Sequence, residues 1–268
     1  MRFSSLIFFA CWGACAPFLR AQAAAPPSTL EQDRPLRVMI DPGHGGIDTG
    51  AFYGSARESE IALKVAQQLQ KRLAADSRFE PMMTRERDLA LSLHERVKKA
   101  DQAKADLFLS IHANSSPDQR ARGVEFYFQN QLPPDEESLF LAASENKHES
   151  VVEINEAAGP AKAEGDLRAI VEDLSRQVRV KKSLLLSRVL ARSWQKEERI
   201  TSSSIRQAPF YVIAKSNRPA VLVELGFLTN PTEAAKLLKS ETHAQIAARI
   251  HAGLLEYLGR QQTKFHLN

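Results

Sequence analysis

The sequence predicts a single α/β domain in which a mainly parallel, twisted sheet carries helices on both faces, together with one helical insertion. Between residues 36 and 260, short apolar runs of strand length alternate with segments whose apolar residues recur at helical spacing. Strands that alternate with helices favour a parallel sheet covered on both sides. The 268 residues are 43% hydrophobic and 25% charged, as in globular proteins with a substantial core, and they contain no visible repeat.

The first half of the domain contains three predicted strands and two predicted helices. The strands are the apolar runs "LRVMID" (36–41), "FEPMMT" (79–84) and "DLFLSIH" (106–112). From Glu58 to Ala75, every fourth residue is apolar, which gives that helix one apolar face: Ile61, Val65, Leu69 and Leu73. The segment "LSLHERVKKADQAKA" (91–105) has the pattern of a second amphipathic helix.

The second half continues the alternation. Its predicted strands are "GVEFYF" (123–128), "PFYVI" (209–213) and "PAVLVE" (219–224). One helix is predicted near 183–198 and a final one over 241–259. The final helix has an apolar stripe formed by Ile246, Ile250, Leu254 and Leu258. Residues 261–268 are then expected to form a C-terminal tail.

Residues 131–182 are a long insertion between strands, with a helical pattern of their own. The first part has one lysine, Lys147, among seven acids: Asp135, Glu136, Glu137, Glu145, Glu149, Glu153 and Glu156. Connections of this length are commonly functional or act as lids. The insertion is therefore a candidate lid.

Residues 1–25 are predicted to be a secretory signal peptide, followed by a polar, proline-containing linker over 26–35. Arg2 precedes an apolar run that is too short to span a bilayer comfortably, and alanines at 21 and 23 fit a cleavage site. An uncleaved anchor, or a lipoprotein signal ending at Cys15, is the alternative. We therefore expect export to the periplasm or the cell exterior, with no stable membrane anchor after cleavage.

Cysteine content and charge narrow the chemistry. Both cysteines lie in the predicted signal, so a transition metal in the mature chain must bind His, Asp or Glu. The formal net charge is only +4, and no basic run interleaved with aromatic residues indicates nucleic-acid binding. We expect no nucleic-acid partner and a monomeric protein.

The stretch "VMIDPGHGGIDTGA" (38–51) surrounds one histidine, His44, with four glycines directly after a predicted strand. Such a turn could cradle a phosphate or present a metal ligand. A P-loop requires a lysine that is absent here, and a dinucleotide fingerprint requires a glycine where Asp48 stands. The phosphate interpretation therefore fails, and a metal site remains.

Three further residues can join His44 at the same edge of the sheet. His112 ends one predicted strand, Glu224 ends another, and Glu58 opens the first helix. Sites in open α/β sheets form at the carboxyl ends of strands, and two imidazoles with one carboxylate are a known catalytic zinc set. Each residue also has a structural alternative: the histidines as surface residues, Glu60 in place of Glu58, and Glu224 paired with Arg85 or Arg218.

Six stretches together resemble the zinc-dependent N-acetylmuramoyl-L-alanine amidases, bacterial cell-wall enzymes that include cell-division amidases. They run in order from residue 37 to 258: "MIDPGHGGIDTGA", "ESEIAL", "TRERDLALSLHERV", "ADLFLSIHANSS", "GVEFYF" and "PAVLVELGFLTNPTE". The resemblance implies Zn2+ on His44, Glu58 and His112, with Glu58 preferred to Glu60 by its distance from Leu63. It implies that Glu224 is the general acid and base of a zinc-hydroxide mechanism.

The implied substrate is peptidoglycan, cleaved at the amide bond between N-acetylmuramic acid and L-alanine. Some cell-division amidases carry a helical segment here that covers the zinc cleft until an activator protein displaces it. Glu149, Glu153 and Glu156 fall on one helix face, so we expect one of them to block the open zinc position. A zinc peptidase acting on the stem peptide and an inactive peptidoglycan-binding or regulatory protein remain the rival functions.

Overall fold

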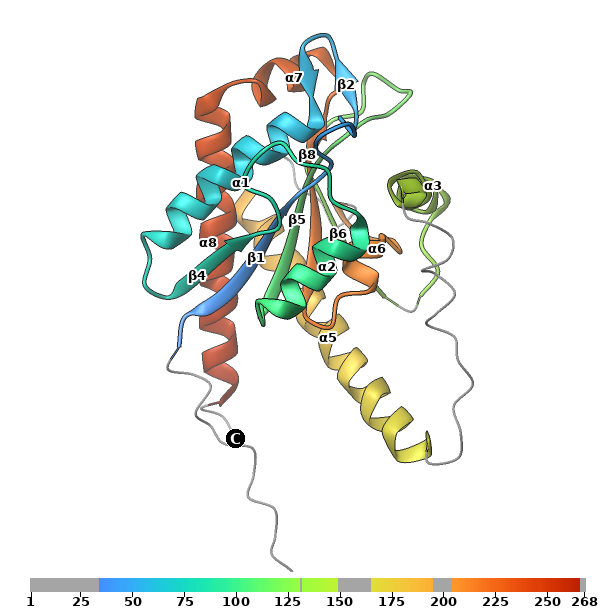
Figure 1. Ribbon diagram of the computed structural model, residues 1–268, viewed down its shortest axis with the longest axis vertical. Coiled ribbons are helices and arrows are strands. Elements are labelled where there is room, and N and C mark those ends of the chain that lie inside the picture. The colour runs from blue at the N-terminus through green and yellow to red at the C-terminus, as the bar shows by residue number, and fades with distance from the viewer. Residues whose placement is uncertain (1–33, 131, 149–164, 195–203, 266–268) are drawn as a thin grey trace, which may run out of the picture. The chain divides into compact units, whose positions relative to one another are not determined.

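A six-stranded sheet in the order β4-β1-β5-β8-β6-β7 forms the centre of the domain (Figure 1). The computed structural model describes residues 34–130, 132–148, 165–194 and 204–265. The strands are β1 (Leu36–Pro42), β4 (Phe79–Met83), β5 (Leu107–Asn114), β6 (Glu125–Phe128), β7 (Ile205–Gln207) and β8 (Ala220–Phe227). The first four in sheet order are parallel, while β6 runs antiparallel to β8 and parallel to β7. The predicted mainly parallel sheet is confirmed.

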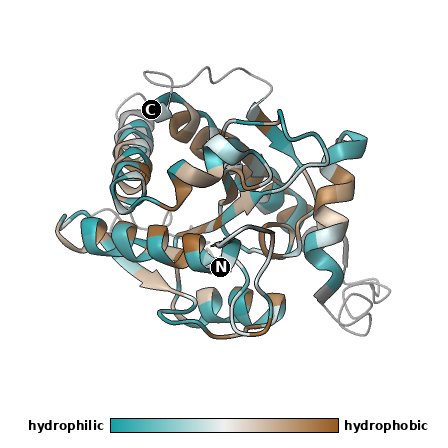
Figure 2. Cartoon of the chain, turned by 90° about the horizontal axis from the view of Figure 1, so that it is seen from above, coloured by the Kyte–Doolittle hydropathy of each residue, from teal (hydrophilic) through white to brown (hydrophobic). Residues whose placement is uncertain are grey.

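Helices cover both faces of this sheet, as predicted. They are α1 (Glu58–Ala74), α2 (Leu93–Gln102), α3 (Glu136–Glu145), α5 (Gly165–Trp194), α6 (Tyr211–Ala214), α7 (Pro231–Leu237) and α8 (Ser240–Phe265). One buried cluster joins α1, α5 and α8 to one face, and a second joins α2 and α6 to the other. Figure 2 shows hydrophilic and hydrophobic residues alternating along these helices, as amphipathic packing requires.

Alternating side chains of the strands supply the two clusters. Along β1, Val38 and Ile40 face α1, α5 and α8, whereas Met39 between them faces α2 and α6. In β5, Leu109 and Phe108 divide in the same way. Because both faces are buried, apolar residues are needed at successive positions, and this explains the continuous apolar runs in the sequence.

The structure corrects one predicted strand. Residues 209–213 do not form a strand: the short helix α6 begins at Tyr211, and the edge strand β7 lies earlier, at Ile205–Gln207. Phe210 to Ile213 are buried as expected for an apolar run. A short apolar run fits a buried strand or a buried helical turn equally well, so its conformation was misjudged while its burial was not.

Several boundaries also differ from expectation. The helix predicted near 183–198 begins at Gly165, so α5 includes the second part of the predicted insertion. Helix α8 continues to Phe265, into the predicted tail. A small hairpin of β2 (Phe52–Tyr53) and β3 (Ala56–Arg57) was not foreseen.

The described residues from Pro35 onward form one compact unit. The predicted signal peptide and nearly all of the linker lie outside the described residues, as do Glu149, Glu153 and Glu156. Within the described ranges, no helix has a stretch long and apolar enough to cross a membrane.

Candidate active site

The four predicted site residues meet at the carboxyl ends of the central parallel strands. His44 follows β1, His112 lies in β5, and Glu58 is the first residue of α1. Glu224 lies in β8 directly beside His112, because these two residues are partners in the strand register. The structure therefore brings the four predicted residues together, at the edge where parallel α/β sheets place their ligands.

The turn after β1 holds His44 in an unusual backbone conformation. Its φ of 54° lies in the left-handed region, which residues with a Cβ seldom adopt. The imidazole Nδ1 lies 2.8 Å from Asp48 Oδ2, which leaves Nε2 facing the site. A carboxylate on one ring nitrogen fixes the orientation of the ring and raises the basicity of the other nitrogen.

Glu58 connects the two histidines. Its Oε1 lies 2.8 Å from His112 Nδ1 and 3.0 Å from His44 Nε2. The same carboxylate accepts hydrogen bonds from the backbone N–H groups of Ala51 and Ala113, at 2.8 and 3.1 Å. Its position is therefore set by the loop and by β5 as well as by its own helix. Glu60, the alternative ligand, is half exposed and pairs with surface residues instead.

Two glycines leave the space that these ligands occupy. A Cβ on Gly43 would collide with the imidazole of His112, and one on Gly50 would collide with Glu58 and His44. Gly50 also has a φ of 63°, which disfavours any other residue. The glycine-rich turn thus allows the backbone to pass directly behind three candidate ligands.

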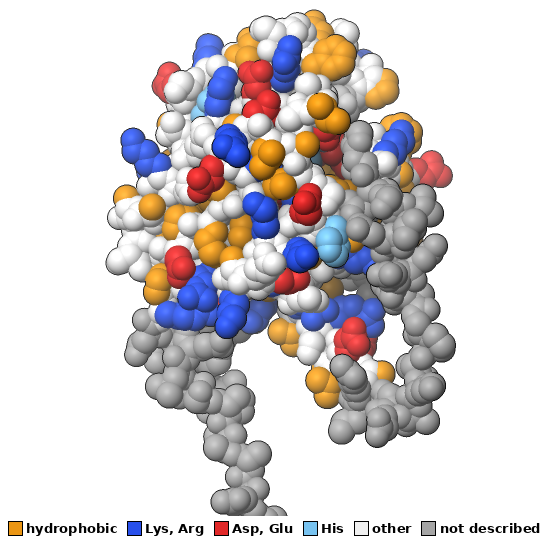
Figure 3. Space-filling model, viewed as in Figure 1, with side chains coloured by type: hydrophobic (Ala, Val, Ile, Leu, Met, Phe, Trp, Pro, Cys, Tyr) orange, Lys and Arg blue, Asp and Glu red, His pale blue; other side chains and the backbone are white. Residues whose placement is uncertain are grey.

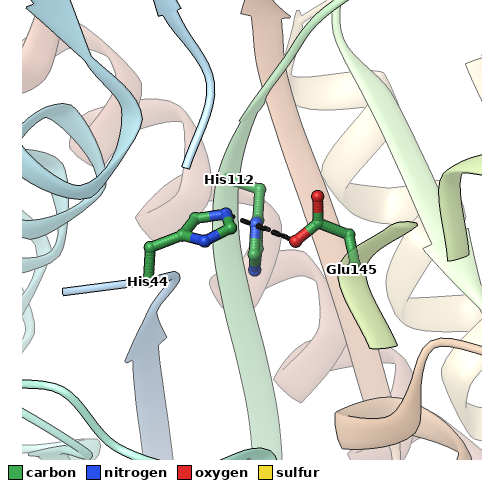
Figure 4. Close-up of side chains that lie close together, drawn as sticks. All are labelled: His44, His112 and Glu145. Carbon is green, nitrogen blue, oxygen red and sulfur yellow. Dashed lines mark ion pairs between the residues drawn. The ribbon is translucent and has the colours of Figure 1, made fainter. Parts of the chain in front are cut away.

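Glu145, at the end of α3, enters the site from the opposite side (Figure 4). Its Oε2 lies 3.3 Å from His44 Nε2 and 3.7 Å from His112 Nδ1. The sequence singled out Glu149, Glu153 and Glu156 by their helical spacing, and all three lie outside the described residues. Glu145 was one of seven acids in the insertion. It lies four residues before Glu149 and so continues the same helical spacing, but the prediction did not single it out.

Polar contacts with residues 205–211 hold both ends of α3. At its start, Arg206 Nη2 donates to Asp135 Oδ1 at 3.1 Å and to Glu137 Oε2 at 2.6 Å. At its end, Asn146 donates to Pro209 O at 3.0 Å and accepts from the N–H of Tyr211 at 2.8 Å. Asn146 directly follows Glu145, so its two hydrogen bonds help to direct the Glu145 carboxylate into the site.

The arrangement around His44 fits a cation. Donor atoms of His44, His112 and Glu145 all lie within 4.8 Å of one another. His44 Nε2 faces two carboxylates, yet it is buried and makes no hydrogen bond to any described residue. Burial alone would lower the pKa of His44, but the carboxylates of Glu58, Asp48 and Glu145 outweigh burial and raise it. Imidazole and carboxylate donors with strong local negative charge suit a zinc ion.

Glu224 is a buried carboxyl group in an environment that favours its protonated form. It is 1% exposed, and its Oε2 has no hydrogen-bond partner among the described residues. Burial raises the pKa of Glu224 well above its usual range, and the nearby carboxylates of Glu58, Glu145 and Glu125 raise it further. Arg85 and Arg218, its alternative partners, donate to backbone carbonyls and to Asp101 instead. A buried carboxyl group with a raised pKa in a cleft is a candidate for general acid–base chemistry.

A cavity of about 270 Å³ opens beside these side chains. It is lined by His44, Asp48, Gly50, Ala51, Glu58, Ala113, Asn114, Ser115, Leu141, Ser144, Glu145 and Glu224. Fold and site together define an α/β enzyme domain whose histidines and carboxylates could hold a metal ion next to a buried acid.

The chain belongs to the N-acetylmuramoyl-L-alanine amidase family, which matches residues 38–256. The resemblance inferred from the six sequence stretches is thereby confirmed. N-acetylmuramoyl-L-alanine amidase AmiA of Salmonella typhimurium is 31% identical over 235 residues, which cover 86% of this chain and 79% of AmiA. AmiC of Escherichia coli is 28% identical over 241 residues, covering 88% of this chain and 56% of AmiC. The chain thus spans little more than half the length of AmiC.

Solved structures share the same fold. The structure of N-acetylmuramoyl-L-alanine amidase AmiC2 of Nostoc punctiforme matches with a TM-score of 0.60 and 27% identity. The match covers 84% of this chain and 97% of that one.

Proposed function

We propose that this protein is a zinc-dependent amidase that removes stem peptides from peptidoglycan. The bond cleaved is the amide between the lactyl group of N-acetylmuramic acid and L-alanine. The observation that supports this most strongly is the convergence of His44, Glu58 and His112 beside the buried Glu224 in a chain of this family.

His44, Glu58 and His112 would hold the metal. Zinc bound there would act as a Lewis acid on the amide carbonyl and would make water more acidic. Asp48 keeps the imidazole of His44 oriented, and the N–H groups of Ala51 and Ala113 hold the carboxylate of Glu58 in place. These contacts fix the donors before substrate arrives, so that little reorganisation is needed.

Glu224 would carry the proton. Its carboxylate takes a proton from the attacking water as the new C–O bond forms at the lactyl carbonyl. It then delivers that proton to the alanine nitrogen as the C–N bond breaks, which leaves a lactyl carboxylate and a free amine. A pKa raised by burial suits a group that must both accept and donate a proton.

Product analysis tests this function. Purified peptidoglycan is incubated with the zinc-loaded protein lacking residues 1–25, and the fragments are identified by mass spectrometry. We expect free peptides that begin with L-alanine, together with peptide-free glycan. A newly formed amine inside the stem peptide would instead identify a zinc peptidase. Binding of peptidoglycan without any cleavage, even by a variant lacking the Glu145 side chain, would indicate an inactive binding protein.

Glu145 is proposed to block this site in the resting protein. Its carboxylate lies against both candidate histidine ligands, at the position from which water or substrate would approach. Because α3 belongs to the acidic insertion, its displacement would open the cavity without disturbing the sheet. This assigns the blocking role to Glu145, with Arg206 and Asn146 retaining the closed state.

An activator protein would displace α3 by binding the rest of the insertion. The first part of α5 exposes four large apolar side chains on a helix: Ile170, Val171, Leu174 and Val178, each more than half exposed. Figure 3 shows hydrophobic side chains along this exposed part of α5. Contiguous exposed apolar residues commonly mark a protein-binding surface. Residues 1–25 are predicted to direct export, and with export the proposed activator would act in the cell envelope.

A further inference from the structure

Arg85 lies just after β4 and is buried beneath the candidate metal centre. The residue is only 2% exposed. The guanidinium donates to four backbone carbonyls, which lie in three separate parts of the chain: those of Pro42, Gly43, Ser59 and Arg87. Burying a cation is costly. A buried guanidinium that binds only carbonyl oxygens therefore calls for a structural or functional explanation.

Two of these contacts join the segments that carry two candidate ligands. Arg85 Nη2 donates to Gly43 O at 2.6 Å, directly before His44. The same nitrogen donates to Ser59 O at 2.9 Å, directly after Glu58. A third bond, from Nε to Pro42 O at 3.0 Å, fixes the start of the turn. One planar group therefore sets the separation between the His44 turn and the first turn of α1.

Arg96, on α2, holds the same turn from another direction. It donates to Pro42 O at 2.7 Å and to His44 O at 2.8 Å, and it pairs with the buried Asp41 at 2.9 Å. Its hydrogen bonds reach the His44 turn but not the start of α1. The carbonyls of three successive residues, 42 to 44, are thus all fixed by guanidinium groups. A left-handed residue such as His44 keeps its conformation only when its surroundings determine it in this way.

We propose that Arg85 is a positioning residue of the metal centre, which holds His44 and Glu58 at the spacing that zinc requires. The inference rests on the proposed zinc site and adds to it a residue that touches neither metal nor substrate. Arg85 contacts only main-chain oxygens of the ligand-bearing segments, so it acts through backbone placement.

Lysine cannot replace Arg85 in this role. A guanidinium presents several donors in one rigid plane, whereas an ammonium is a single point on a flexible stem. Arg85→Lys keeps the charge but cannot hold Gly43 O and Ser59 O together in the same geometry. Arg96→Lys removes one of two supports of the His44 turn and leaves the Arg85 contact with Ser59 intact.

The test measures metal binding rather than turnover. Zinc affinity of the whole protein is determined by competition with a chromophoric chelator, and the absorption spectrum of the cobalt-substituted protein reports ligand geometry. Arg218→Lys is the matched control, because Arg218 is also largely buried and donates to a backbone carbonyl, that of Ala105, away from the site. Circular dichroism establishes that each variant is folded.

We expect Arg85→Lys to bind zinc about 10- to 100-fold more weakly than the parent, the usual loss on removing a residue that supports a ligand. Its cobalt spectrum should be altered, and Arg96→Lys should show a smaller loss. Arg218→Lys should stay within about two-fold of the parent, because its site is distant and independent.

Parent-like zinc affinity and an unchanged cobalt spectrum in folded Arg85→Lys would overturn the positioning role. If Arg85→Lys does not fold, Arg85→Gln is measured in its place, and parent-like zinc affinity with an unchanged cobalt spectrum in that folded variant overturns the role. A parent protein that binds no zinc would contradict the proposed function as well as this role, and so the two failures are distinguishable.

Discussion

The two sides of the candidate site are held in place by different physical means. His44, Glu58 and His112 lie on the sheet and its first helix, where backbone N–H groups and buried guanidinium groups fix them. Glu145 arrives on α3, which is held by contacts with Arg206 and Asn146. Asp135 and Glu137, which bind Arg206, have side chains that are 53% and 69% exposed.

This difference suggests a division of labour between the two sides. Exposed ion pairs contribute only about 0–1 kcal/mol each, whereas breaking a buried pair costs about 3–5 kcal/mol. Segments that must move are drawn from the weakly held parts of a protein. We therefore expect His44, Glu58 and His112 to stay in place when Glu145 and α3 move. These two parts of the site are called the fixed side and the movable side.

The largest expected effect on activity comes from replacing Glu224, the buried acid of the fixed side. Glu224→Gln keeps the size of the side chain but cannot accept a proton. We expect activity to fall by about 10²- to 10⁴-fold, the usual contribution of general acid–base catalysis. Turnover on peptidoglycan is measured together with zinc content. Full zinc occupancy with parent-like turnover would show that Glu224 carries no proton.

The next largest expected effect on activity comes from removing the carboxylate of Glu145, on the movable side. Glu145→Ala is expected to raise basal activity by roughly 5- to 150-fold, the range of typical coupling free energies between protein states. Glu136→Ala is the control, since this exposed glutamate lies on the same helix but outside the cavity. Equal activities of the two variants would refute autoinhibition by Glu145.

Weakening the attachment of α3 should have a smaller effect in the same direction. Glu137→Ala removes one contact of α3 with Arg206 and leaves the Arg206 pair with Glu125 intact. We expect basal activity to rise by about two- to five-fold, because the Glu137 side chain is exposed. Arg192→Met, which breaks a surface pair with Glu256, is the matched control. A rise of the same size in that control would attribute the effect to general loosening.

The buried pair of Asp41 and Arg96 should make the free energy of unfolding depend on pH. Burial would raise the pKa of Asp41, but Arg96, Thr84 and Ser110 outweigh burial and lower it below its usual value. A lowered folded-state pKa adds stability that is present above the unfolded value and is lost as pH falls through the folded value.

Asp41→Asn should therefore lower the free energy of unfolding by about 3 kcal/mol at neutral pH, and this loss should shrink in strong acid. Urea unfolding across the pH range measures it. Asp118→Asn, an exposed control that breaks a pair with Arg120, should cost less than about 1 kcal/mol. A loss at Asp41 that does not depend on pH would contradict the ion pair with Arg96.

The strands that carry the fixed side could be predicted from the apolar runs of the sequence. Apolar runs located β1, β5 and β8, and the residues at their carboxyl ends met as parallel topology requires. The pattern could not decide between strand and helix for 209–213, because a short buried run satisfies both. Arg85 was considered only as a partner for Glu224, because backbone carbonyls are acceptors that a sequence does not reveal.

The movable side was less predictable. The acidic insertion was recognised and a blocking glutamate was expected. Glu145, the glutamate of α3 that lies against the histidines, was not among the three glutamates singled out, and those three lie outside the described residues. Which acid enters the cavity depends on where α3 ends and on how Asn146 contacts residues 209–211. Such contacts between distant segments leave no local periodicity in the sequence.

The most direct measurement is the rate at which peptides beginning with L-alanine are released from purified peptidoglycan. Parent and Glu145→Ala proteins are compared, each loaded with zinc and each after chelation. The account predicts the same products from both, faster release by Glu145→Ala, and no release after chelation until zinc is restored. Zinc-loaded Glu145→Ala that releases no such peptide would contradict it.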